Sequence, residues 1–376
     1  MKIGYDAKRA FYNYSGLGNY SRSALLLLQQ YYPDNEYYLY TPKIKNAIPF
    51  HCGKPFIVRQ PDSFLAKKFS AFWRSLSMSS AINKDRLDIF HGLSNELPSD
   101  IENANVKSIV TIHDLIFLRF PQFFSRIDNQ IYLRKFKNSC LKADKIIAVS
   151  EQTKHDIVNY FQIAPEKIVV SYQGCASQFW DTVSESKKVE VKKKYALPDT
   201  FVLNVGTIEP RKNLISLIHS LNYAKHDAKI VAIGRPVKKY MAELQQLIQR
   251  KKLEDRVIFL HNVPNEDLPA IYQTASLFAY PSFFEGFGIP IVEAMASKVP
   301  VITSKGSCFP ETGGDAAIYI NPNNPEEIAI LTDKILEDGK LRQEMIAKGL
   351  THVQKFSDEA VVHSLMGVYK SVMAEK

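Results

Sequence analysis

The chain has 376 residues, more than one compact core ordinarily holds, so we expect two domains. Hydrophobic residues make up 45% of the chain and charged residues 23%, with no low-complexity tract, which excludes the disordered and fibrous classes. No run of roughly 18 apolar residues occurs, and charges stand in the amino-terminal segment where a secretory signal needs apolar residues. We therefore expect a cytoplasmic protein without a membrane span.

The net charge of +9 is concentrated in the first half of the chain. Residues 1–172 contain 23 Lys and Arg against 15 Asp and Glu, a net charge of +8, and the remainder contains 25 against 24. Such a field attracts anionic lipid headgroups, nucleic acid or a phosphate-bearing acceptor. Residues 64–76 mix aromatic and basic side chains as an interfacial helix does, although an ordinary core-facing helix also fits them. Peripheral contact with the inner face of a membrane therefore stays open.

The cysteines predict no disulfide framework and no metal knuckle. They are widely spaced and form no C-x-x-C pair, so free buried thiols in a reducing compartment are expected. The four are Cys52, Cys140, Cys175 and Cys308.

Apolar runs of strand length alternate with amphipathic stretches of helix length, a pattern typical of βαβ units and parallel sheets. In the first half we expect helices at residues 20–31 and 129–142. The strands expected there are residues 2–7, 37–40, 88–91, 108–113, 145–149 and 167–172.

The alternation of strand-length and helix-length stretches is interrupted at residues 181–194, a polar stretch that fits a linker or a peripheral helix. After the second strand series, Asn324, Pro325 and Glu327 provide a cap, a first-turn proline and a carboxylate, which predict a helix start. No strand-like sequence follows, so the last helix is free to reach back across the first domain. We expect two successive doubly wound domains. The second strand series comprises residues 201–205, 229–233, 256–260, 276–280, 300–303 and 317–320.

The most informative segment is residues 280–296, where an expected strand leads into a glycine loop and then a helix opened by a proline. Glycines let a ligand approach the backbone, and unpaired N–H groups at a helix start favour an anion such as phosphate. Glu285 in the loop and Glu293 in the first helical turn would face one crevice and accept hydrogen bonds from sugar hydroxyls. The alternatives are a loop surface charge for Glu285 and a helix-dipole preference for Glu293.

A second segment, residues 205–214, places Arg211 and Lys212 just past a strand end. Adjacent guanidinium and ammonium groups can neutralise a diphosphate and stabilise it as a leaving group. A solvated helix start is the alternative. Because the sequence contains no D-x-D pair and no cluster of His or Cys, we expect protein cations rather than a metal to hold the diphosphate.

Two weaker signals lie in the first half. Gly16 and Gly18 follow the first strand, where doubly wound folds bind phosphates, but a G-x-G pair also fits a plain tight turn. His113 ends a strand on the same sheet edge and could meet a ligand between the domains, although lone histidines are more often structural.

Together these segments resemble glycosyltransferase family 4, whose members are retaining enzymes of the GT-B fold, over nearly the whole chain. The resemblance implies two Rossmann-like domains facing across a cleft: residues 1–175 binding the acceptor, and residues 176–357 binding the nucleotide-sugar donor. It also implies that residues 358–376 form a helix returning to the first domain. The matching segments are residues 16–20, 112–115, 148–151, 206–214, 280–282, 285–290, 293–296 and 310–314.

The resemblance also implies roles for these residues. Arg211 and Lys212 hold the donor diphosphate, Glu293 binds the ribose, and Glu285 with the amides of residues 286–288 grips the sugar. His113 lies beside the sugar under the reacting carbon. The implied catalytic residues are His113, Glu285, Arg211 and Lys212; the implied donor-binding residues are Gly16, Gly18, Arg211, Lys212, Glu285, Gly286, Phe287, Gly288, Ile289 and Glu293.

Two departures from the family pattern occur. Lys298 stands where the family usually has a glycine after the helix, and a left-handed lysine there costs roughly 1 kcal/mol. Ile289 and Ile291 replace the commoner leucine and proline beside the sugar loop, which leaves the sugar preference open.

The expected function is transfer of a hexose, with mannose from GDP-mannose weakly favoured, to a surface-glycan or lipid-linked saccharide. We expect no cofactor, no metal and no nucleic-acid partner. The alternatives are a nucleotide-sugar epimerase of the same shape and, because of the basic first half, an anionic-lipid or nucleic-acid binding protein.

Overall fold

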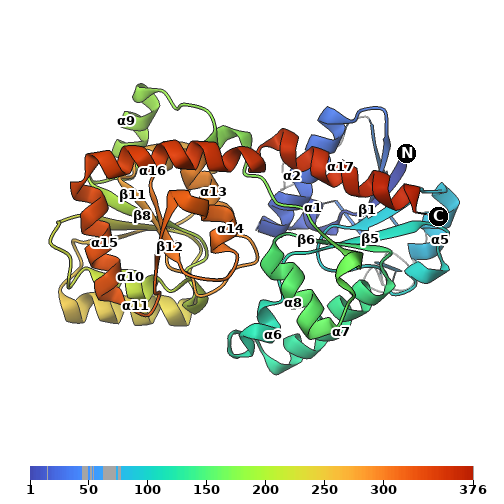
Figure 1. Cartoon of the computed structure of the whole chain (residues 1–376), viewed down its shortest axis with the longest axis horizontal. Coiled ribbons are helices and arrows are strands. Elements are labelled where there is room, and N and C mark those ends of the chain that lie inside the picture. Colours follow the sequence, from blue (N-terminus) through green and yellow to red (C-terminus); the bar gives the residue numbers. More distant parts are fainter. Residues whose placement is uncertain are drawn as a thin grey trace. The chain divides into compact units, whose positions relative to one another are not determined.

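The computed structural model describes residues 1–14, 16–44, 50, 53, 55–61, 73–74 and 78–375 (Figure 1). The chain forms two compact units: Met1–Gln173 with Asp358–Lys376, and Gly174–Ser357. Of the aromatic and basic segment 64–76, only Trp73 and Arg74 are among the described residues, and Cys52 lies outside them too.

The first unit contains a seven-stranded sheet in the order β3-β2-β1-β4-β5-β6-β7. Every pair of neighbouring strands is parallel. The strands are β1 (Lys2–Asp6), β2 (Glu36–Tyr40), β3 (Phe56–Arg59), β4 (Ile89–Gly92), β5 (Lys107–Ile112), β6 (Lys145–Ala148) and β7 (Ile168–Val170).

Both faces of this sheet are buried under helices. Tyr37 and Leu39 of β2 pack in one core with α2 and α17, whereas Tyr38 and Tyr40 pack in another with α5, α7 and α8. Successive side chains of a strand point to opposite faces, so a sheet covered on both sides needs a continuous apolar run. The longer helices are α2 (Gly16–Tyr31), α5 (Met78–Asp85), α7 (Arg126–Lys142), α8 (Glu151–Phe161) and α17 (Asp358–Ala374), and α1 (Lys8–Tyr12) and α6 (Ile116–Arg119) are short.

The second unit contains a six-stranded sheet in the order β10-β9-β8-β11-β12-β13, again parallel. Its strands are β8 (Phe201–Val205), β9 (Lys229–Ile233), β10 (Val257–Leu260), β11 (Leu277–Tyr280), β12 (Val301–Ser304) and β13 (Ala317–Ile320). Its helices are α9 (Glu185–Lys194), α10 (Leu214–Ser220), α11 (Lys238–Lys251), α12 (Leu268–Thr274), α13 (Ile289–Ala296), α14 (Phe309–Gly313), α15 (Pro325–Glu337) and α16 (Gly339–His352).

The predicted doubly wound α/β architecture with two Rossmann-like sheets is confirmed, and all twelve expected strands are present within a few residues. The strand β3 was not expected. It is a four-residue edge strand in which only Phe56 is buried, so its sequence carries little of the apolar signal of a central strand.

Several local expectations are also confirmed. Residues 181–194 contain the peripheral helix α9, which buries only Val191. The Asn324 side chain caps α15 by accepting from the backbone N–H of Glu327. Lys298 has φ 63° and follows α13 in a Schellman motif, in which its N–H donates to Met295 O and that of Val299 donates to Ala294 O.

The last helix, α17, belongs to the core of the first unit, as expected (Figure 1). It buries Leu365, Met366 and Tyr369, among others, beside α2. Its Ser364 hydroxyl also lies 2.9 Å from the hydroxyl of Ser171, just after β7. No helix among the described residues is long and apolar enough to cross a membrane.

Strand order determines where a site can form in each sheet. The order reverses between β1 and β4 in the first sheet and between β8 and β11 in the second. At such a switch point the loops at the carboxyl ends diverge to opposite faces and leave a crevice. In the second unit these are the loops that carry Arg211, Lys212 and Glu285.

Candidate active site

The loops after β8 and β11 are joined by hydrogen bonds at the switch point of the second sheet. The buried Asn213 side chain donates to Pro281 O at 3.1 Å and to Pro322 O at 2.8 Å, and the Phe283 N–H donates to Arg211 O at 2.9 Å. Gly206 has φ 146° and lies against the Lys212 side chain, where its missing Cβ would be 3.5 Å from Lys212 Cε. The two loops therefore form one local structure.

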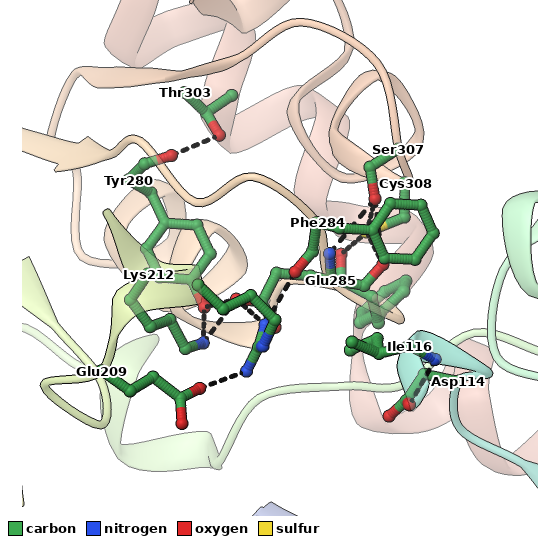
Figure 2. Close-up of polar contacts among 12 residues, drawn as sticks. Asp114, Ile116, Glu209, Lys212, Tyr280, Phe284, Glu285, Thr303, Ser307 and Cys308 are labelled. Atoms are coloured by element: carbon green, nitrogen blue, oxygen red, sulfur yellow. Dashed lines mark hydrogen bonds and ion pairs between the residues drawn. The ribbon is translucent and has the colours of Figure 1, made fainter. Parts of the chain in front are cut away.

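The loop after β11 is also supported from the next strand end. Ser307 Oγ accepts from the Glu285 N–H at 3.2 Å and donates to Glu285 O at 3.0 Å. The buried Cys308 thiol lies 2.9 Å from Phe287 O and 3.2 Å from Glu285 O. Gly288 has φ 100° at the N-cap of α13, a left-handed conformation that favours glycine. Figure 2 shows Ser307 and Cys308 beside Glu285.

One oxygen of the Glu285 carboxylate contacts both cations of this site (Figure 2). Glu285 Oε1 lies 2.6 Å from Lys212 Nζ, 2.8 Å from an Arg211 Nη atom and 3.1 Å from the Tyr280 hydroxyl. Arg211 also donates to Phe284 O at 2.7 Å and to Glu209 Oε1 at 2.6 Å. Lys212 Nζ contacts the Tyr280 hydroxyl as well. The side chains of Arg211, Lys212 and Glu285 are only 11–14% exposed.

The pKa values show how these groups depend on one another. Burial alone would raise the pKa of Glu285, but Arg211 and Lys212 outweigh it and lower the pKa to about 2. Burial lowers the pKa of Lys212, while the Glu285 carboxylate opposes that shift. The pKa of Arg211 is raised because Glu285 and Glu209 outweigh its burial. The cluster thus stabilises the fold above the ordinary Glu pKa of 4.5, and that contribution is lost as the pH falls toward 2.

Glu293 is the fifth residue of α13, one turn further into the helix than predicted, and it contacts a different group from Glu285. Its Oε2 accepts from the Tyr272 hydroxyl at 2.8 Å, and its burial raises its pKa to about 7. The Tyr272 ring packs against Phe278 with centroids 5.5 Å apart, and Phe278 stacks on Tyr280 at 5.8 Å. One aromatic row in the second unit thus carries the hydroxyl partners of both predicted glutamates.

In the first unit, His113 directly follows β5 and is 6% exposed. Its Nε2 lies 2.8 Å from Leu93 O, its Nδ1 lies 3.1 Å from Gln173 Nε2, and its N–H donates to Asn95 Oδ1 at 2.7 Å. The Tyr20 ring packs edge-on to the imidazole, with centroids 4.7 Å apart. Burial lowers the pKa of His113 to about 4, so the ring is neutral at pH 7.

The two glycines near the amino terminus differ in their surroundings. A Cβ on Gly18 would lie 1.9 Å from Asn13 O, so only glycine fits there. Gly16 begins α2 and has open space around it. Packing therefore explains Gly18 without a ligand, and a phosphate contact at either position stays a prediction.

Of the predicted residues, the structure joins Arg211, Lys212 and Glu285 by direct contacts, with Gly286, Phe287, Gly288, Ile289 and Glu293 in the same unit. His113, Gly16 and Gly18 belong to the first unit. Sequence reasoning missed Glu209, Tyr280 and the support from Ser307 and Cys308. A signal was available for the last two, since they follow the expected strand at 300–303, whose carboxyl end meets the same sheet edge.

In the part of the chain that the structure describes, no group of three or more His, Cys, Asp or Glu residues could hold a metal ion. The described cysteines, Cys140, Cys175 and Cys308, are free and buried, as expected. That the reaction needs no metal stays a prediction.

Two family models match successive parts of the chain. Residues 22–178 match the model described as "Glycosyltransferase Family 4", and residues 186–352 match "Glycosyl transferases group 1". The O-antigen chain mannosyltransferase B of Escherichia coli is 32% identical over 287 residues, 75% of this chain and 74% of that protein. The chain belongs to glycosyltransferase family 4.

A further relative and two solved structures are also similar to this family 4 glycosyltransferase. The O-antigen chain mannosyltransferase RfbU of Salmonella typhimurium is 32% identical over 57% of each chain. Among solved structures, a sucrose-phosphate synthase from Thermosynechococcus elongatus matches with a TM-score of 0.81 at 19% identity over the whole of both chains. Anabaena HepE in complex with UDP and glucose matches with a TM-score of 0.77 at 20% identity, over 99% of this chain and 100% of that one. These structures support the GT-B fold.

Replacing Glu285 by glutamine tests the charge balance of the cluster. The substitution leaves Arg211 and Lys212 buried without their shared carboxylate, so the free energy of unfolding should fall by about 3 kcal/mol. Inorganic pyrophosphate should then raise the melting temperature of Glu285→Gln more than that of the wild type, because the anion supplies the missing charge. Thermal and urea unfolding measure both effects.

The matched control is Glu209→Gln, which removes the more exposed partner of Arg211 and should cost under about 1 kcal/mol. If Glu285→Gln were as stable as the wild type, or if pyrophosphate stabilised both proteins equally, the charge balance described above would be wrong.

Proposed function

We propose that this glycosyltransferase transfers a hexose, with mannose favoured, from a nucleoside diphosphate donor to a surface-glycan or lipid-linked saccharide acceptor. The observation that carries the proposal is the buried contact of Arg211 and Lys212 with Glu285 at a sheet switch point. Mannose, and GDP-mannose as its donor, are favoured because relatives at about 30% identity are named mannosyltransferases, two of them O-antigen chain mannosyltransferases.

Arg211 and Lys212 would bind the donor diphosphate and stabilise it as the leaving group. In the free protein their charges are balanced by Glu285 and Glu209, so the cations remain inside the protein before a donor arrives. Because they are already in place and largely shielded from water, they need little reorganisation when negative charge develops on the diphosphate. This role would make a divalent metal unnecessary.

When the diphosphate binds the cations, Glu285 would exchange part of its contacts and accept hydroxyl hydrogen bonds from the sugar. The backbone amides of residues 286–288 would complete the sugar site. Phe287 is 4% exposed and packs edge-on against Phe356, with centroids 5.3 Å apart, so only its backbone could contact the sugar. Ile289 is half-buried at the start of α13 and would border this site.

We propose that transfer retains the anomeric configuration, with a leaving-group phosphate oxygen accepting the proton of the acceptor. His113 would lie beside the sugar. Its neutral ring suits a reaction whose transition state carries positive charge on the sugar, because an imidazolium would repel that charge. No side chain is assigned as the general base.

Transfer itself is tested by incubating the protein with a panel of nucleotide sugars and a lipid-linked saccharide acceptor. We expect the fastest transfer from GDP-mannose, and an α-linked product from this α-linked donor, as determined by NMR. Arg211→Met should reduce transfer by at least about a hundredfold if the guanidinium stabilises the leaving group. Donor conversion without acceptor would instead support an epimerase, and an inverted product would contradict retention.

The ionisation of Glu293 predicts a pH dependence of donor binding. A ribose hydroxyl donates more strongly to a carboxylate than to a neutral carboxyl group, and the pKa of Glu293 is raised to about 7. Affinity for GDP should therefore weaken by about tenfold between pH 8 and roughly pH 6, as the group gains its proton. Calorimetric titration of wild type and Glu293→Gln separates this effect from titration of the phosphates. A similar pH dependence in both proteins would exclude Glu293 from ribose binding.

The proposal includes peripheral contact with an anionic membrane, supported by the outward face of α7. Ile127 is 73% exposed, Leu141 55% and Ile131 45%, and helical spacing places the three on one face. The exposed Arg126, Arg134 and Lys137 lie on or beside this face, and within the described residues none has an ion-pair partner. Apolar side chains among unpaired cations are typical of helices that lie in an anionic lipid surface.

The double variant Ile127→Ser/Arg134→Ser tests this contact. Binding to vesicles that contain phosphatidylglycerol should fall by at least about tenfold, since one apolar and one cationic contribution are removed. Sedimentation with the vesicles measures the partition coefficient. The matched control, Ile330→Ser/Lys334→Ser, changes an exposed apolar and basic pair on α15 and should bind like the wild type. Equal binding by all three proteins would exclude α7.

A further inference from the structure

Gln173 makes a hydrogen bond that the proposed function does not use. Its side-chain Nε2 lies 3.1 Å from Nδ1 of His113, while His113 Nε2 lies 2.8 Å from Leu93 O. Gln173 follows β7 and is the last residue of the first unit before the chain enters the second. Both nitrogens of the imidazole are therefore held by protein groups.

These partners determine the tautomer of His113. A carbonyl oxygen only accepts, so Nε2 must carry the proton that is donated to Leu93 O. In the neutral ring Nδ1 is then an acceptor, and the amide N–H of Gln173 supplies the matching donor. The amide is neutral, so it supports this tautomer without favouring the imidazolium.

The remaining surroundings hold the ring plane. The Tyr20 ring packs edge-on to His113, and the Tyr20 hydroxyl lies 3.3 Å from Thr111 Oγ1. Thr111 Oγ1 lies 2.8 Å from His91 Nε2, whose other ring nitrogen lies 2.8 Å from the Tyr369 hydroxyl on α17. A buried polar chain thus reaches from the last helix to the ring that supports His113.

We propose that Gln173 is a positioning residue, whose amide N–H binds Nδ1 and, together with Leu93 O at Nε2, holds the His113 imidazole in the Nε2-protonated tautomer required beside the transferred sugar. The proposal rests on the proposed function for the place of His113. Gln173 itself need not contact the donor. It acts by fixing the orientation of the ring and by giving Nδ1 a donor instead of an acceptor.

Replacing the Gln173 amide by a carboxylate gives Nδ1 of His113 an acceptor in place of a donor. In Gln173→Glu an acceptor faces Nδ1 while Leu93 O still faces Nε2, and only the doubly protonated imidazolium satisfies both. The other ionisable groups around His113 stay as they are: Arg9, which opposes protonation, the neutral His91 and Tyr20, and the neighbouring Asp114, whose carboxylate accepts from Ile116 N–H. The variant therefore isolates the effect of Gln173.

The test is a ring-nitrogen NMR titration of His113 in the free protein. We expect the pKa to rise from about 4 in the wild type by about 1–3 units in Gln173→Glu. Gln173→Met, which removes the donor without adding an acceptor, should keep the ring neutral, with Nε2 still donating to Leu93 O and Nδ1 left without its donor. The matched control is Gln162→Glu, an exposed amide in the same unit that makes no contact with His113.

Kinetics at saturating donor provide the second readout. In Gln173→Glu, kcat should fall about tenfold for each pH unit below the raised pKa, because an imidazolium opposes charge on the sugar. The kcat of wild type and of Gln162→Glu should not show this fall at acidic pH, the acidic limb of the pH profile. An unchanged pKa of His113 in Gln173→Glu overturns the positioning role, whatever the kinetics show. A raised pKa without the acidic limb overturns the place of His113 beside the sugar, and with it this part of the proposed function.

Discussion

The second unit depends on one electrostatic constraint: two cations buried at a sheet switch point need a carboxylate at the same place. Glu285 Oε1 receives Lys212 at 2.6 Å and Arg211 at 2.8 Å, and the pKa of Glu285 is lowered to about 2 by these two charges. Without that carboxylate, the desolvation of the two cations would be uncompensated. An anionic ligand meets the same requirement, so one arrangement supports both the folded free protein and the binding of a diphosphate.

The fold supplies this arrangement through its strand order. β8 and β11 are neighbours in the sheet although their loops are about seventy residues apart in sequence, and the order of strands reverses between them. Hydrogen bonds from Asn213, Ser307 and Cys308 then fix the two loops. Most of these bonds involve the backbone, so the positions of Arg211 and Glu285 follow from local chain geometry more than from their own side-chain contacts.

Much of this could be predicted from the sequence, and the parts that could not have physical reasons. Buried parallel strands have strong apolar runs, so all the central strands were found, whereas the half-buried edge strand β3 was missed. Arg211, Lys212 and Glu285 were identified because they follow strand ends in glycine-containing loops. Their direct contact could not be read from the sequence, since either cation could have faced solvent. The hydrogen bond between Gln173 and His113 joins two loops sixty residues apart, and no local sequence pattern predicts it.

The central claim is that the cations held by Glu285 are the diphosphate site. A crystal structure with a bound nucleoside diphosphate sugar tests it most directly. We predict phosphate oxygens within hydrogen-bond distance of both Arg211 and Lys212, with Glu285 turned toward the sugar hydroxyls and Glu293 at the ribose. A diphosphate bound elsewhere, while Glu285 still pairs with both cations, would contradict the account.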